Sequence, residues 1–330
     1  MLLAIPLAVS SQQEASAMHL RTIIIPAAGQ GTRLLPATKA VPKELMNVYD
    51  RPVLQFAIDE AIDAGAERII VVIHPDKLVI RDYLTPDQDY IGRLGASGKT
   101  MLSAALAAVQ VPDEVDLVFA FQNRPLGLGH AISCCSAMVL PGPVGVILPD
   151  DVIMGDACLT QMGKAYVGGH MVAAMTVLAQ DAPRYGIFRL LGSPTGRSIA
   201  VSSMVEKPKA GTEPSLLAAV GRYILDPVIF STLLDTPRGA GGEIQLTDAI
   251  ALDADCIALT AFRFSGQRFD CGSHDGLIDA GLARQRTVKS QRNGTPLVNG
   301  SAKLQDWLNH SPPPAQRFDG RVTPLEGSVS

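Results

Sequence analysis

The apolar residues of this chain fall into short runs that alternate with stretches of helical periodicity from Thr22 onward. The run "TIIIPA" (22–27) predicts a first strand, and "RIIVVIH" (68–74) predicts a second. Because the second run is apolar at nearly every position, both of its faces are expected to be covered. Between them, "RPVLQFAIDEAIDAG" (51–65) has apolar residues four positions apart, which predicts a helix that begins at Pro52. Strands and helices that alternate in this way indicate a mostly parallel sheet.

The pattern continues with a polar helical insertion to about residue 110, followed by strands at "VDLVFAF" (115–121) and "GPVGVIL" (142–148). Beyond residue 151 the predicted strands become longer and have polar breaks. They are "HMVAAMTVLAQ" (170–180), "YGIFRL" (185–190), "SIAVSSMVEKP" (198–208) and "AAVGRYILDP" (218–227). No linker separates the two parts. The sequence therefore predicts one α/β domain over residues 19–290, with a Rossmann-like, mixed and mostly parallel sheet flanked by helices and enlarged by a β extension.

Both ends of the chain lack this pattern. "LLAIPLAV" (2–9) followed by "ASA" (15–17) has the form of a signal-peptide core and cleavage site, but no basic residue precedes it. The apolar run is also too short to cross a bilayer, which takes about 20 residues. Residues 1–18 are therefore predicted to be a flexible extension, and the proline-containing residues 291–330 a flexible tail.

The composition is that of an ordinary soluble protein, with 47% hydrophobic and 18% charged residues in a chain of 330. A net charge of -4 argues against a general nucleic-acid binder, because such proteins need a broad basic surface. The 5 cysteines have no CxxC spacing, which fits a reducing compartment and gives no zinc site.

The segment after the first predicted strand, "PAAGQGTRLLPATKAVPKEL" (26–45), is the first candidate for a binding site. Gly29 and Gly31 follow the strand directly, where backbone N–H groups can bind phosphate oxygens. A tight turn without a ligand would explain the glycines equally well. The dinucleotide-binding fingerprint is excluded, because its third glycine would fall at Leu34.

Three basic residues in the same segment favour an anion site. Arg33, Lys39 and Lys43 are irregularly spaced, and the prolines at 36 and 42 prevent one regular helix from presenting them to solvent.

The segment resembles the signature of the sugar-nucleotidyltransferases, and among them most closely the bacterial uridylyltransferases. Further family stretches recur in order within residues 20–285: "PLGLGHA" (125–131), "VILPDD" (146–151), "RYGIF" (184–188), "VEKP" (205–208), "GRYILDPVIF" (221–230), "GGEIQLTDAI" (241–250) and "RFDCGSHDG" (268–276). The resemblance implies a nucleotidyltransferase fold in which residues 19–150 bind the nucleotide and residues 151–290 the sugar phosphate.

The reaction implied by the resemblance is attack of glucose 1-phosphate on the α-phosphorus of UTP, which gives UDP-glucose and pyrophosphate with the help of Mg²⁺. The alternatives are transfer from dTTP or to another sugar 1-phosphate, a non-catalytic nucleotide-sugar-binding protein, and an exported binding protein. A cytoplasmic homodimer or homotetramer without nucleic-acid or membrane partners is expected.

The resemblance assigns catalytic roles to three cations. Arg33 and Lys43 neutralise the triphosphate, and Lys207 holds the phosphate of the sugar phosphate and stabilises charge at the α-phosphorus. For Lys39, a role at the phosphates and a position facing solvent both remain open.

Two aspartates are the predicted metal ligands. Asp150 ends an apolar strand, where open α/β sheets place ligand-binding groups, and carboxylates suit Mg²⁺. Its neighbour Asp151 could share the task, but adjacent residues point different ways, so Asp150 is favoured. By resemblance, Asp270 is the second metal ligand. The alternative interpretation is that Asp270 only caps the turn before Gly272.

The other predicted site residues contact substrates. By resemblance, the backbone of Ala28, Gly29 and Gly31 surrounds the nucleotide, Gln122 reads the base, and Gly127 lets uracil approach. Gly186 faces the sugar, and Glu206 binds the hydroxyl groups of the sugar.

The attacking phosphate is already ionised near neutral pH and needs no general base. We therefore interpret His130 as structural, and Cys271 as a packed thiol.

Overall fold

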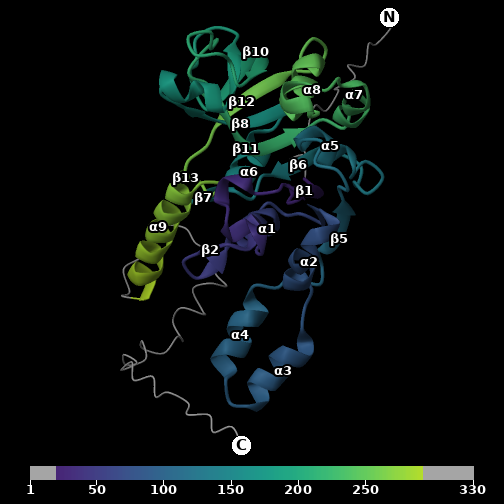
Figure 1. The fold of residues 1–330 in the computed structure, drawn as a ribbon. Helices are drawn as coiled ribbons and strands as arrows, with labels where there is room; N and C mark the ends of the chain where they lie inside the picture. Colours follow the sequence, from purple (N-terminus) through teal and green to yellow (C-terminus); the bar gives the residue numbers. More distant parts are fainter. Residues whose placement is uncertain (1–19, 293–330) are drawn as a thin grey trace, which may run out of the picture.

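The computed structural model describes residues 20–292 (Figure 1). The predicted N-terminal extension and residues 293–330 of the predicted tail lie outside the described residues. Residues 291 and 292, which were predicted to belong to the tail, are instead the last two of helix α9 (His274–Arg292).

The strands are β1 (Thr22–Pro26), β2 (Asn47–Val48), β3 (Arg51–Pro52), β4 (Arg68–Ile73), β5 (Asp116–Phe121), β6 (Val144–Ile147), β7 (Asp151–Met154), β8 (His170–Thr176), β9 (Gly186–Leu190), β10 (Ser198–Glu206), β11 (Leu217–Leu225), β12 (Leu259–Arg263) and β13 (Gln267–Asp270). The α-helices are α1 (Val53–Asp63), α2 (Leu78–Leu84), α3 (Gln88–Ala96), α4 (Thr100–Ala108), α5 (Leu128–Ser133), α6 (Cys158–Ala165), α7 (Ile229–Asp235), α8 (Leu246–Asp253) and α9.

The central sheet of the described chain has 9 strands in the order β5-β4-β1-β6-β11-β8-β12-β10-β9. The predicted α/β class is confirmed, and so is a mixed, mostly parallel sheet, because only β10 and β11 run opposite to the other strands. Strands β5, β4, β1 and β6 run parallel, whereas β11 is antiparallel to β6 and β8, and β10 is antiparallel to β12 and β9. Strands β9 and β10 follow one another in the chain and pair directly, which accounts for one of these antiparallel pairs.

Two apolar layers form the main core, one on each face of this sheet. Alternate residues of β1 belong to opposite layers, with Ile24 in one and Ile23 and Ile25 in the other, as the two-residue repeat of a strand requires. Helices α5, α7 and α8 contribute to the first layer, and α1 and α6 to the second. The predicted helix after residue 51 is confirmed, with Leu54 and Ile58 fully buried.

The predicted helical insertion is also confirmed, as α2, α3 and α4. Figure 1 shows α3 and α4 extending away from the sheet, at the opposite end of the molecule from β10. Among the helices of residues 20–292, none combines the length and apolar character that a bilayer crossing requires.

The carboxyl ends of β1 and β6 lie side by side, because the two strands are parallel neighbours with Ile24 paired to Val146. The glycine loop leaves β1 there, and Asp150 follows β6. Asp151 begins the short strand β7, which pairs with β13 so that Asp151 lies opposite Asp270. Residues far apart in sequence are thereby brought to one edge of the sheet.

Candidate functional site

The glycine loop turns sharply after β1. Gly31 has φ 67° and ψ 28°, a left-handed conformation that glycine adopts without strain. The Thr38 hydroxyl donates to the Gly31 carbonyl oxygen at 2.8 Å. Among the described residues, the amides of Ala28, Gly29, Gln30 and Gly31 donate no hydrogen bond. The loop therefore presents backbone donors that remain available to an anion.

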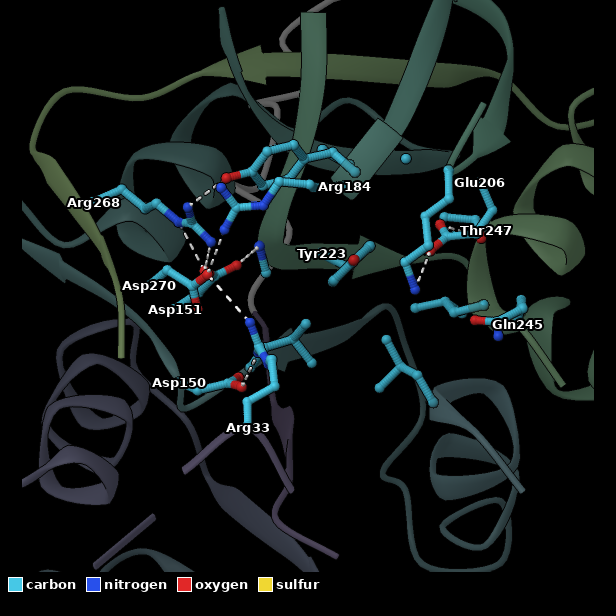
Figure 2. A pocket seen from close by; sticks show the side chains of 18 residues that line it. Arg33, Asp150, Asp151, Arg184, Glu206, Tyr223, Gln245, Thr247, Arg268 and Asp270 are labelled. Carbon is cyan, nitrogen blue, oxygen red and sulfur yellow. Dashed lines mark hydrogen bonds and ion pairs between the residues drawn. The ribbon is translucent and has the colours of Figure 1, made fainter. Parts of the chain in front are cut away.

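Two predicted cations meet the two predicted metal ligands beside this loop, and Figure 2 shows one of them, Arg33, beside Asp150 and Asp270. Lys43 Nζ lies 2.6 Å from Asp150 Oδ2. Arg33 bridges both carboxylates, with Nη1 at 3.3 Å from Asp270 Oδ2 and Nη2 at 3.7 Å from Asp150 Oδ2. Burial by itself would raise the pKa of Asp150, but attraction to Lys43 and Arg33 outweighs it and the pKa lies below its ordinary value. Asp150 is thus ionised at neutral pH.

Asp151 is engaged differently from its neighbour. Its Oδ1 accepts hydrogen bonds from the Arg268 guanidinium, one of them from Nε at 2.7 Å, and its Oδ2 accepts from the Gly221 amide at 2.8 Å. Burial raises the pKa of Asp151 in spite of Arg268. Both oxygens already have partners in the protein, which supports a structural role for Asp151.

A cavity of about 520 Å³ extends from the Arg33 cluster to the carboxyl end of β10 and the middle of β11. Arg184 lines it and reaches Asp270 Oδ2 with Nη2 at 3.5 Å. Arg268 donates to Tyr185 Oη at 3.1 Å, and both of these residues also line the cavity. Tyr185 therefore packs partly against the core and also contributes to the cavity wall.

Glu206 and Thr247 lie at the far end of the cavity from Arg33 (Figure 2), and Gly186 and Lys207 also line the cavity. Glu206 Oε2 accepts from Thr247 Oγ1 at 3.0 Å, and Glu206 Oε1 lies 3.4 Å from Lys207 Nζ. Lys207 adopts φ 44°, which is uncommon for a residue other than glycine, and its amide donates to the Tyr185 carbonyl at 3.0 Å. A Cβ on Gly186 would lie 3.2 Å from Glu206 Oε2, so glycine keeps this end open.

The residues predicted to contact the base form a separate group, which does not line this cavity. Gln122 Nε2 donates to the Gly127 carbonyl at 3.0 Å and lies 3.0 Å from His130 Nδ1. A Cβ on Gly127 would lie 2.7 Å from Glu243 Cβ and 2.8 Å from the Ile244 carbonyl oxygen, so close packing against residues 243–244 also requires glycine there. Burial lowers the pKa of His130 and so favours the neutral imidazole, and the contact with Gln122 fits the structural role predicted for this residue.

Lys39 lies away from the carboxylates. It is exposed and lines a smaller cavity of about 260 Å³ together with Ala28, Gln30, His74 and Lys77. No described residue forms an ion pair with Lys39, which fits the solvent-facing alternative.

Several residues of the site were missed by the sequence analysis. Charged side chains at Arg184 and Arg268 have no local pattern that identifies them, although both lie in stretches that resemble the family. Lys77 carries a detectable signal, since it follows the apolar strand β4 as Asp150 follows β6.

A model of the nucleotidyl transferase family matches residues 22–286. The chain is 38% identical over 267 residues to a UTP–glucose-1-phosphate uridylyltransferase of Pseudomonas aeruginosa, covering 79% of this chain and 94% of the relative. It is 39% identical over 266 residues to the enzyme of that name from Bacillus subtilis, covering 80% and 90%.

Two solved structures are also similar. A UDP-glucose pyrophosphorylase complexed with UDP-glucose has a TM-score of 0.72 and 33% identity, covering 81% of this chain and 99% of that one. A UTP-bound UGPase from Acinetobacter baumannii has a TM-score of 0.74 and 38% identity, covering 80% and 93%. The chain therefore belongs to the nucleotidyl transferase family, in the group of bacterial UTP–glucose-1-phosphate uridylyltransferases.

Proposed function

We propose that this chain transfers the uridylyl group of UTP to glucose 1-phosphate, forming UDP-glucose and releasing pyrophosphate. The observation that carries the proposal is the contact of Arg33 with both Asp150 and Asp270, beside a glycine loop with available amides. Two anionic substrates must meet in this reaction, and the cluster provides cations next to carboxylates suited to Mg²⁺. Pyrophosphate release from UTP and glucose 1-phosphate tests the proposal.

The nucleotide phosphates would lie between the glycine loop and Arg33, which lines the near end of the cavity. The loop amides of Ala28, Gly29 and Gly31 would cradle the triphosphate, and Arg33 and Lys43 would neutralise its charge. The reaction needs little covalent chemistry from the protein, so positioning and electrostatic stabilisation account for the catalysis.

The carboxylates of Asp150 and Asp270 fit a Mg²⁺ site that substrate completes. Among the described residues, no group of 3 or more His, Cys, Asp and Glu side chains could hold a metal by itself. The Oδ2 atoms of Asp150 and Asp270, however, each lie within 3.7 Å of a nitrogen of the Arg33 guanidinium. The two carboxylates are therefore close enough to contact the same cation. Mg²⁺ commonly takes one or two carboxylates and completes its shell with phosphates and water. When bound there, it would hold the phosphates and neutralise their charge.

The sugar phosphate fits the far end of the cavity. Glu206, held by Thr247, has the hydrogen-bonding capacity to accept from sugar hydroxyls, and Gly186 leaves room for the ring. Lys207 is half exposed at the cavity wall, from which it would reach the sugar phosphate. For the base, Gln122 and Gly127 are proposed as contacts, with the Gln122 amide already oriented by the Gly127 carbonyl.

Lys207→Ala is expected to lower kcat/KM for glucose 1-phosphate by about 100-fold, through both a lower kcat and a higher KM, because a charge-assisted contact in the transition state is lost. KM for UTP should change little. Steady-state kinetics with each substrate varied in turn will measure this, and Lys209→Ala, at an exposed lysine two positions along the chain, is the control. A change confined to UTP affinity would contradict the role proposed for Lys207.

A nucleotide panel tests the substrate. With glucose 1-phosphate fixed, we expect kcat/KM for UTP to exceed that for dTTP by at least about 10-fold. If dTTP were used far better, the chain would be a thymidylyltransferase. A parallel panel of sugar 1-phosphates tests the preference for glucose.

Two further expectations rest on the proposed reaction. A cytoplasmic location follows from the need for UTP, and cell fractionation would test it. The prediction of a homodimer or homotetramer can be tested by light scattering of the purified protein.

A further inference from the structure

Lys77 lies beneath the glycine loop, outside the stretches that resemble the family. It ends the 3-10 turn Pro75–Lys77, which follows β4. Because β4 and β1 are parallel neighbours, the carboxyl end of β4 adjoins the start of the loop. The Lys77 ammonium donates to the carbonyl oxygen of Ala27 at 2.9 Å and to that of Gly29. The Lys77 side chain is only 13% exposed.

These two contacts fix the orientation of two peptide planes. In a planar trans peptide the N–H points away from the C=O of the preceding residue. Holding the carbonyls of Ala27 and Gly29 on the side of Lys77 therefore turns the amides of Ala28 and Gln30 toward the opposite side. Thr38 acts in the same way on the Gly31 carbonyl. The amides of Ala28 and Gln30, which donate to no described residue, are thus both turned away from the buried ammonium of Lys77.

Lys77 also forms an ion pair with Glu44, the residue after the proposed catalytic Lys43. Lys77 Nζ lies 2.9 Å from Glu44 Oε2, and the Glu44 side chain has 0% exposure. Glu44 directly follows Lys43, whose Nζ contacts Asp150. One ammonium group therefore connects the glycine loop with the segment that carries Lys43.

We propose that Lys77 is a positioning residue for the nucleotide phosphates, which it serves by fixing the loop carbonyls so that the amides of Ala28 and Gln30 face the triphosphate. The inference rests on the proposed binding of UTP by this loop. Lys77 does not itself touch the substrate in this arrangement. Its removal should therefore weaken UTP binding and leave the site of the sugar phosphate intact.

The test is calorimetric titration of the full chain with UTP in magnesium-containing buffer, with no sugar phosphate present. Lys77→Met is expected to raise the Kd for UTP by at least about 10-fold. KM for glucose 1-phosphate, measured at saturating UTP, should change by less than about threefold. Lys164→Met, at an exposed lysine on α6, is the matched control and should bind UTP normally.

A second variant separates positioning from folding, because Lys77→Met alone leaves the buried Glu44 carboxylate unpaired. In Lys77→Met/Glu44→Gln that charge is absent, so thermal stability should recover while UTP binding stays weak. Recovery of UTP affinity in this double variant, or normal affinity in Lys77→Met, would overturn the proposal. Absence of UTP binding by the unmodified chain would instead contradict the proposed function.

Discussion

Asp150→Asn is expected to lower kcat by at least about 100-fold, the usual loss when one group that organises transition-state charge is removed. The substitution keeps the shape of the side chain and removes its negative charge. That charge faces Lys43 Nζ at 2.6 Å and Arg33 Nη2 at 3.7 Å. Without it, the proposed Mg²⁺ site loses one of its two carboxylates and Lys43 loses its partner.

Initial rates of pyrophosphate release at saturating substrates, over a range of magnesium concentrations, will measure this effect. Asp113→Asn, at an exposed aspartate in the connection before β5, is the control and should leave kcat unchanged. An Asp150→Asn enzyme with near-normal turnover and an unchanged magnesium dependence would show that Asp150 does not hold the metal.

Arg222→Met is expected to lower the free energy of unfolding by about 3–5 kcal/mol, because it leaves a buried carboxylate without its cation. Arg222 is 1% exposed and contacts Glu60 Oε2 through Nη2 at 2.8 Å and Nε at 2.9 Å. Glu60 Oε1 accepts from the Leu159 amide at 2.9 Å. The pair thereby ties β11 to α1 and to the start of α6.

Urea unfolding followed by circular dichroism will give the free energies, and the double variant Glu60→Met/Arg222→Met is the informative comparison. Removing both charges together eliminates the unpaired carboxylate, so the double variant should be more stable than Arg222→Met. If both variants lose the same free energy of unfolding, the loss comes from the packing of the arginine side chain and not from the unpaired buried carboxylate.

The fold of residues 20–150 could be predicted well, because its signals are local. An apolar run such as that of β1 marks a buried parallel strand, and the polar residues that follow must lie at the carboxyl edge of the sheet. The strand pattern by itself thus predicts that Gly29, Gly31 and Asp150 share one edge, and the fold brings them together there.

Strand direction in the second half could not be predicted in the same way. The spacing of apolar residues shows that a segment is a strand, but it does not show which neighbour the strand pairs with. The strands β12 and β13 were missed because polar residues interrupt their apolar positions.

The roles of single charged residues depend on distant partners. Arg184, for example, gains its place in the site only because β13 brings Asp270 to within 3.5 Å of it. Asp151 and Asp150 have the same side chain and adjacent positions, yet the pairing with Arg268 and with Gly221 distinguishes them. The assigned roles of these residues stay predictions until the variants are measured.

The place of β12 in the sheet has a consequence for synthesis of the protein on the ribosome. This strand, Leu259–Arg263, lies between β8 and β10, which are made much earlier. A nascent chain that has not yet reached residue 259 must hold β8 and β10 with unpaired edges, which are prone to pair with other chains. Chains terminated prematurely before this strand are therefore expected to aggregate, even though every residue of the glycine loop is already present.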